Sequence, residues 1–230
     1  MTKRAILTYW NFQIDPQIPT AQNRVIFAFS DVSTDYKPLN YNAPDGKVFP
    51  DQAIDFGLST LFDQENYDTV LVLDVDCVPL SANALKYTFE QAESGKIIGN
   101  IQRSNHLQND EHVFVGSSCF CMTKQTYNQF GKLSFACTNR GDIGEEYTYR
   151  AEQSGFPLEM YMPKSFQSAP VACESWPLKT GMPNYGIGTT FANKDGEEMF
   201  YHLFESRTHK NTKLFLDKCA SIMESIRVKI

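Results

Sequence analysis

The chain has 230 residues, of which 42% are hydrophobic and 21% are charged. These fractions are ordinary for a globular protein and exclude a disordered chain, a collagen-like chain and a coiled coil. The formal charge of −6 comes with no dense basic stretch, which disfavours binding to nucleic acid. The length allows one large domain or two small ones at roughly 150 residues each. Because no repeat or linker interrupts the chain, we expect a single domain over residues 1–230.

Neither a membrane span nor a secretory signal is expected. No stretch approaches 18 consecutive apolar residues, and the apolar run near the N-terminus is too short for a signal peptide. The six cysteines include no CxxC pair, so a zinc site has little support. We therefore expect reduced thiols in a cytoplasmic protein.

Strands and helices are predicted to alternate through the first half of the chain. Apolar runs of β-formers mark the strands, and apolar stripes at helical spacing mark the helices. The expected strands cover 4–10, 36–41, 70–73, 96–102 and 113–122, and the expected helices cover 21–30, 50–64, 82–92 and 124–130. Thr20 and Ser81 are the expected caps of two of these helices. This alternation favours an α/β fold with a mostly parallel central sheet.

The second half of the chain is more irregular. A helix is predicted over 145–154, with Gly155 just past its end. Proline, glycine and asparagine are frequent over 168–195, where we expect loops. The remaining expected elements are strands over 160–163 and 199–204 and an amphipathic helix over 212–228.

The most informative motif is Asp74-Val75-Asp76, which directly follows the apolar run VLVL. Side chains alternate faces along a strand, so Asp74 and Asp76 are expected to point the same way. In an open α/β sheet, ligands bind at the carboxyl ends of the strands. Two carboxylates that converge there repel each other unless a cation lies between them, and Mg²⁺ or Mn²⁺ suits oxygen ligands. The motif predicts a divalent-metal site that holds phosphates; the alternative is a strand end in solvent.

Four segments between residues 67 and 207 follow one another in an informative order: YDTVLVLDVDCVPLS, VGSSCFCMTKQTYNQFG, GDIGEEYTYRAEQSGF and FYHLFESR. They resemble segments of the GT-A glycosyltransferases, whose small bacterial and phage-type members are the most similar. In that family the first segment carries the DxD motif, the second lines the acceptor side, the third opens a helix with an acidic pair, and the fourth supplies a metal-binding histidine. The resemblance implies a GT-A-like fold with helices on both faces of the sheet. It also implies a nucleotide-sugar half at about 1–105 and an acceptor and catalytic half at about 106–230.

The resemblance implies a metal-dependent transfer of a sugar from a nucleotide-sugar, most simply a UDP-sugar, to a hydroxyl of a glycan or another acceptor. Asp76 would be the principal ligand of Mn²⁺ or Mg²⁺, and Asp74 would contact the metal through water or the ribose. His202 matches the histidine ligand of the family. A neutral imidazole suits Mn²⁺, which accepts mixed nitrogen and oxygen ligands. His209 is the alternative ligand, and a histidine at a strand end without a metal is the other interpretation.

The general base is expected in the acidic segment around residues 142–146. The resemblance places it at Glu146, with Glu145 as its neighbour and Asp142 as the fallback. A base there would deprotonate the acceptor hydroxyl in an inverting single displacement. The alternative is that Glu145 and Glu146 only complement the dipole at a helix start.

Further candidates for donor binding lie at strand ends and on one helix. Tyr9 and Trp10 end the first strand, where the family places residues against the nucleotide base; the alternative is that both rings belong to the core. Asp55 is placed to reach the ribose or to face solvent. Arg103 and His106 follow the strand over 96–102, where a cation would offset diphosphate charge.

Two other classes compete with this interpretation. A haloacid-dehalogenase-like phosphatase would use Asp74 as nucleophile, but its motif normally lies on the first strand of the chain. A non-catalytic carbohydrate-binding domain would suit an aromatic content of 13%, yet it gives no reason for convergent acidic residues. The aromatic residues expected in loops, which are compatible with a homodimer, are Trp176, Tyr185 and Phe191.

Overall fold

The structure is a computed structural model that describes residues 2–41, 50–104, 111–167, 175–204 and 209–227. The strands are β1 (Arg4–Trp10), β2 (Thr34–Asn40), β3 (Thr69–Asp74), β4 (Cys77–Pro79), β5 (Ile97–Arg103), β6 (Val113–Thr123), β7 (Leu158–Ser165), β8 (Ser175–Pro177), β9 (Asn184–Gly186), β10 (Thr189–Ala192) and β11 (Glu198–His202). The helices are α1 (Gln17–Phe29), α2 (Pro50–Ser59) with its π-helical continuation η1 (Thr60–Gln64), α3 (Ala82–Glu93), α4 (Lys124–Gln129), α5 (Glu145–Ser154) and α6 (His209–Arg227).

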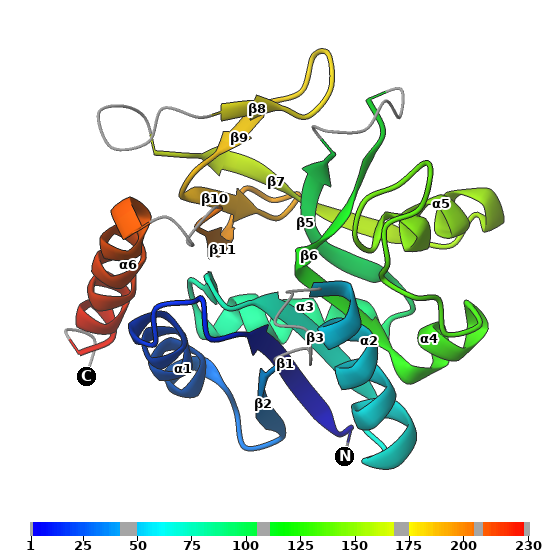
Figure 1. Cartoon of the computed structure of the whole chain (residues 1–230), viewed down its shortest axis with the longest axis horizontal. Helices are drawn as coiled ribbons and strands as arrows, with labels where there is room; N and C mark the ends of the chain where they lie inside the picture. Colours follow the sequence, from blue (N-terminus) through cyan, green and yellow to red (C-terminus); the bar gives the residue numbers. More distant parts are fainter. Residues whose placement is uncertain (1, 42–49, 105–110, 168–174, 205–208, 228–230) are drawn as a thin grey trace.

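A mixed sheet of nine strands forms the centre of the molecule, in the order β2-β1-β3-β6-β5-β7-β10-β11-β4 (Figure 1). Among the described residues, the parallel pairs are β1–β2, β1–β3 and β5–β7, and the other five pairs are antiparallel. Helix α1 connects β1 to β2, and α2 connects β2 to β3. Parallel pairing of β1 with β2 and β3 requires such long crossovers. A shorter connection joins β5 to β6, which pair antiparallel. The expected α/β fold is confirmed. Within the described residues the sheet is mixed rather than mostly parallel, because only three of its eight strand pairs are parallel, and helical crossovers set that parallel part.

Helices cover both faces of this sheet, as predicted. Alternation along β1 sends Ile6 to one core, and Ala5 and Leu7 to the other. The first core includes apolar residues of α1 and α3, and the second includes apolar residues of α2 and α5. A sheet buried on both faces explains why the run VLVL in β3 is continuously apolar.

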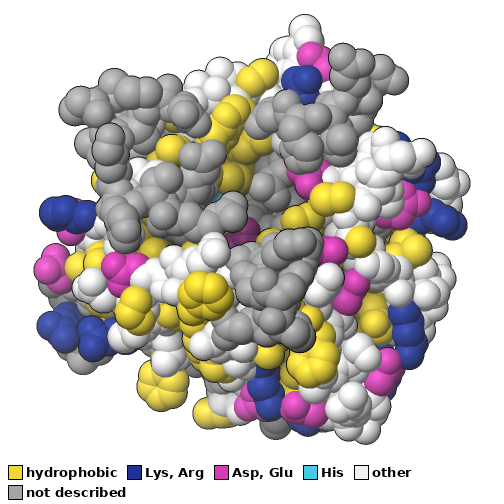
Figure 2. All heavy atoms as spheres, in the orientation of Figure 1, with side chains coloured by type: hydrophobic (Ala, Val, Ile, Leu, Met, Phe, Trp, Pro, Cys, Tyr) yellow, Lys and Arg dark blue, Asp and Glu magenta, His cyan; other side chains and the backbone are white. Residues whose placement is uncertain are grey.

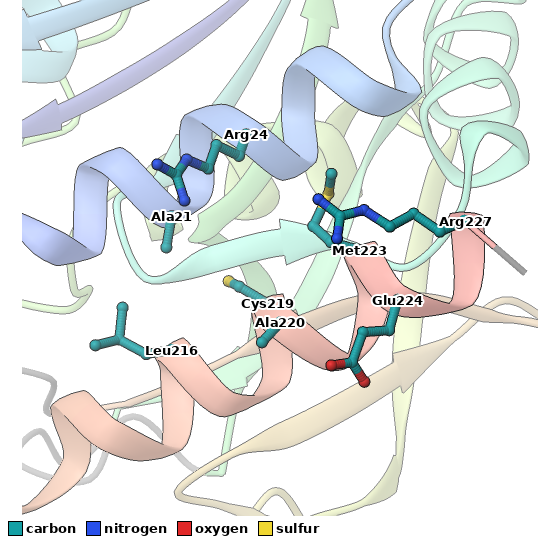
Figure 3. Close-up of a pocket in the computed structure, with 8 residues that line it drawn as sticks. All are labelled: Ala21, Arg24, Leu216, Cys219, Ala220, Met223, Glu224 and Arg227. Carbon is teal, nitrogen blue, oxygen red and sulfur yellow. The ribbon is translucent and has the colours of Figure 1, made fainter.

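A third core lies where α1 and α6 pack beside β4 and β11. It includes Val25, Val78, Tyr201 and Phe215. Between these two helices, the surface forms a groove (Figure 3). The groove is lined by Ala21, Arg24, Leu216, Cys219, Ala220, Met223, Glu224 and Arg227.

Most elements match their predicted positions, and local signals account for the matches. The ends of β1 and α5 are as expected, Gly155 ends α5 with a φ of +67°, and the Ser81 hydroxyl accepts a hydrogen bond from the Ala84 amide at the start of α3. The predicted cap at Thr20 is wrong. Helix α1 begins at Gln17, and the Thr20 hydroxyl donates to the Pro16 carbonyl.

The prediction of loops over 168–195 is also wrong within the described residues, because β8, β9 and β10 lie there. These strands have three or four residues each, too few for a periodic pattern, and partners distant in sequence define them. Tyr185 and Phe191 are buried and pack with Trp176 and Phe204. These rings therefore do not provide the exposed aromatic surface that suggested a homodimer.

Within the described ranges, no helix combines the length and the apolar character that a membrane crossing requires.

Candidate metal centre

The Asp-Val-Asp motif lies in a tight turn between two strands. Strand β3 ends at Asp74, and β4 begins at Cys77. Strand β4 pairs with β11, in which His202 is the register partner of Cys77. The Leu203 amide also donates to the Asp76 carbonyl over 3.0 Å. This pairing brings a histidine to the motif from 126 residues further along the chain.

The side chains of Asp74, Asp76 and His202 form a compact cluster, with one ligand atom of each lying within 4.8 Å of the others. The Nε2 atom of His202 lies 3.1 Å from Oδ1 of Asp76 and 3.5 Å from Oδ2 of Asp74. His202 and Asp76 are buried, and Asp74 is half-buried. Acidic side-chain atoms are visible near the bottom of a hollow at the centre of the face drawn in Figure 2.

The negative charges of Asp74 and Asp76 together have the largest electrostatic effect on His202 in this cluster. Burial by itself would lower the pKa of His202, but the carboxylates of Asp76 and Asp74 outweigh that effect, and the pKa is raised from its ordinary value. Tyr9 is the register partner of Asp74, and its hydroxyl donates a hydrogen bond to Oδ1 of Asp74. Burial and the Asp74 carboxylate together raise the pKa of Tyr9 well above its usual range. Tyr9 thus orients one carboxylate of the cluster.

The donor set fits a divalent cation. Two carboxylates and one imidazole offer mixed oxygen and nitrogen ligands, which suit Mn²⁺ better than a soft metal. The carboxylates lie close enough to repel each other, so a cation between them would stabilise the turn. The buried Nδ1 atom of His202 has no hydrogen-bond partner among the described residues. The Nε2 atom, which faces both aspartates, is the nitrogen available to a metal.

The acidic segment before and within α5 is built differently. Glu145 is completely buried. Its carboxylate lies 2.6 Å from Nδ1 of His112 and accepts a hydrogen bond from the Asp142 amide over 2.8 Å. The other ring nitrogen of His112 lies 3.1 Å from Glu152, and the ring stacks on Tyr149. This carboxylate therefore joins α5 to the start of β6.

Glu146 is half-buried and is held by two arginines. Arg140 donates to both of its carboxylate oxygens, over 2.6 and 3.0 Å, and Arg150 donates over 3.2 Å. Hydrogen bonds and charge from Arg140, more than those from Arg150, lower the pKa of Glu146. Asp142 is also half-buried and accepts a hydrogen bond from the Ile143 amide over 2.8 Å.

The other residues that the sequence predicted to bind the donor or the metal lie in several parts of the fold. Asp55 accepts hydrogen bonds from the Ser134 hydroxyl and the Phe135 amide, which tie α2 to the segment before α5. Trp10 packs against the third core. Arg103 lies 3.6 Å from Glu111, and its Nε atom is buried without a hydrogen-bond partner among the described residues. His106 and the side chain of His209 lie outside the described residues.

Two polar residues near these sites were not predicted. Gln22 is fully buried and contacts the Asp-Val-Asp turn, and His112 contacts Glu145. The signal for Gln22 is an amide within the apolar stripe of α1, beside Ile18, Val25 and Ile26. No comparable signal marks His112, because its partners lie 33 and 40 residues away.

A scan against protein-family models gave no match, and neither did a search of curated proteins. Among solved structures, the chain is similar to the catalytic domain of Drosophila β1,4-galactosyltransferase 7 in complex with xylobiose (19% identity, 69% of this chain and 64% of that one, TM-score 0.46). A substituted form of that enzyme, solved with manganese, UDP-Gal and xylobiose, gives 20% identity, the same coverage and a TM-score of 0.47. A Desulfovibrio desulfuricans protein assigned as a nucleotide-diphospho-sugar transferase gives 9% identity over 69% of this chain and 79% of that one, with a TM-score of 0.43. The chain thus spans less than two thirds of the Drosophila domain.

Proposed function

We propose that this protein is a metal-dependent glycosyltransferase of the GT-A type, which moves a sugar from a nucleotide-sugar to an acceptor hydroxyl. The observation that carries the proposal is the convergence of Asp74, Asp76 and His202 at the carboxyl end of β3. Such a cluster suits a cation that itself binds a diphosphate. The donor class we favour is a UDP-sugar, and the acceptor is a glycan or another hydroxyl compound.

In this proposal, Asp76 and His202 hold Mn²⁺ or Mg²⁺ directly, and Asp74 completes the site with its carboxylate oriented by Tyr9. The metal, when bound, neutralises charge on the departing diphosphate. The donor half of the chain, about 1–105, supplies both aspartates, and the half from about 106 to 230 supplies His202 and the acidic segment. Arg103, whose Nε atom has no hydrogen-bond partner in the part of the chain that the structure describes, is the proposed further contact to the diphosphate.

The proposed base belongs to the segment from Asp142 to Glu146, and the reaction is an inverting single displacement. A general base must reach the proton that it removes. The complete burial of Glu145 makes it the weakest of the three candidates. Glu146 is the first choice and Asp142 the second. In Glu146, the pairing with Arg140 keeps the carboxylate ionised, and it also lowers the basicity of that carboxylate.

The five described cysteines carry free thiols, and this supports a reducing compartment, which we propose to be the cytoplasm.

The first test is calorimetric titration of UDP with and without Mn²⁺, using the wild type and Asp76→Asn. We expect binding only when both the metal and Asp76 are present. Asp217→Asn is the matched control, because Asp217 is an exposed aspartate on α6 that pairs with Lys213. Metal-independent UDP binding, or equal binding by Asp76→Asn, would contradict the proposed role of the cluster. If UDP and other nucleotides fail to bind, hydrolysis of p-nitrophenyl phosphate tests the alternative, a phosphatase with Asp74 as nucleophile.

A further inference from the structure

Gln22 occupies an unusual position for an amide side chain. It lies on the face of α1 that packs against the sheet, between Ile18 and Val25, and it is completely buried. A buried amide without partners costs several kcal/mol, so its retention in a core points to hydrogen bonds. The partners of Gln22 identify what those bonds hold.

The amide of Gln22 makes four hydrogen bonds. Its nitrogen donates to the carbonyls of Asp74 and Cys77, each over 2.7 Å. Its oxygen accepts from the hydroxyls of Thr8 over 3.0 Å and Tyr36 over 3.2 Å. Two donors and two acceptor lone pairs are the full capacity of a primary amide. The hydroxyls of Thr8 and Tyr36 therefore fix which end of the amide faces the turn.

The two carbonyls that Gln22 holds bracket the Asp-Val-Asp turn. Asp74 is the last residue of β3 and Cys77 is the first of β4, so one side chain joins both ends of the turn. The opposite side of the turn is held by β11, through the pairing of Cys77 with His202 and the bond from the Leu203 amide to Asp76. Without these restraints, the like charges of Asp74 and Asp76 would drive the carboxylates apart.

We propose that Gln22 is a positioning residue of the metal centre. It fixes the backbone from which both carboxylates project, so that they face His202 and one cation before the metal arrives. It touches neither metal nor substrate in this role. The inference rests on the metal site of the proposed function, but not on the identity of the donor or the acceptor.

The test is the affinity for Mn²⁺ alone, measured from the loss of the paramagnetic resonance signal of the free ion. Gln22→Met has nearly the same shape and removes all four hydrogen bonds. We expect it to weaken Mn²⁺ binding by roughly 10–100-fold, the range typical when an outer-shell partner of a metal ligand is removed. Gln22→Asn is the second variant. It keeps the amide but is one methylene shorter, so we expect a loss in the same direction, and it serves if Gln22→Met does not fold.

Thr88→Val is the matched control. Thr88 is completely buried, and its hydroxyl bonds the Ala84 carbonyl and the Tyr161 hydroxyl. Its loss should lower the melting temperature without changing the affinity for Mn²⁺. An equal loss of affinity in Thr88→Val would mean that general destabilisation explains the result, and would overturn the inference.

The outcomes also separate this inference from the proposed function. If the wild type binds Mn²⁺ and the folded Gln22 variants bind it equally well, the positioning role is overturned while the metal centre stands. If the wild type binds no Mn²⁺ with or without UDP, the metal-dependent function and the inference fail together.

Discussion

Two segments of this chain each carry a pair of acidic residues, but their surroundings differ. At the Asp-Val-Asp turn, the ion-pair partner of Asp74 and Asp76 among the described residues is His202. At the start of α5, Glu145 lies against His112, and Glu146 is held by Arg140 and Arg150. The first motif has two carboxylates around one imidazole, whereas the second carries at least one cationic side chain for each carboxylate.

The difference teaches how to separate a metal site from a structural acidic pair. A buried carboxylate is stable only when hydrogen bonds or opposite charge compensate it. Glu145 and Glu146 obtain that compensation from the protein itself. At the turn, both carboxylates and the imidazole of His202 converge on one point, where an added cation can contact all three.

The largest effect should be the response of thermal stability to metal. A ligand present at 100 times its dissociation constant stabilises the folded state by about 2.7 kcal/mol. In a domain of this size, that corresponds to a rise of roughly 5–10 °C in melting temperature. We expect this rise on adding Mn²⁺ to the wild type and to Glu146→Gln, but not to Asp76→Asn, as measured by calorimetry. A lost response in Glu146→Gln would show that the two motifs are not distinct in metal binding.

A smaller effect is expected from neutralising the buried glutamate. Glu145→Gln removes the charge that His112 faces and weakens the hydrogen bond from the Asp142 amide. We expect the free energy of unfolding to fall by about 2 kcal/mol, the range for a disrupted buried hydrogen bond to a charged group. Urea denaturation measures this change. Glu90→Gln, at an exposed carboxylate near Lys86, is the control and should change it by less than about 0.5 kcal/mol. Equal effects of the two substitutions would argue against a structural role for Glu145.

The smallest effect concerns pH. Burial lowers the pKa of His112, but Glu145 and Glu152 outweigh it, so the pKa in the folded state is raised above the ordinary value of 6.5. A raised pKa means that the stabilisation is complete below about pH 6.5 and is lost as the pH rises through the folded-state pKa. Tyr149 stacks on the His112 ring, and Arg140 lies over the ring of Tyr149.

We therefore compare the unfolding free energy of the wild type with that of His112→Asn at each pH. The difference in favour of the wild type should be larger at pH 5.5 than at pH 8.5, by up to about 1 kcal/mol. Urea denaturation across that range measures the difference. A difference between the two proteins that stays constant with pH would show that His112 does not titrate in this contact.

The fold could be predicted from the sequence where local signals were strong. The run VLVL, the cap at Ser81 and Gly155 after α5 each act over a few residues, and the structure has the elements that they predict. The strands β4, β8, β9 and β10 were missed. Each has three or four residues, and their hydrogen-bonded partners, not their own patterns, make them strands.

The sequence by itself determined that two aspartates lie at the carboxyl end of a buried strand, because a short apolar run that forms a strand is a local property. Tertiary structure decided which groups surround each acidic side chain. His202 reaches Asp76 across 126 residues, Gln22 reaches Cys77 across 55, and His112 reaches Glu145 across 33. Compensation of charge depends on distances of a few ångströms between such groups. That compensation depends on how the strands pair and on how α1 and α5 pack on the sheet. It therefore distinguishes the two acidic motifs only in the folded protein.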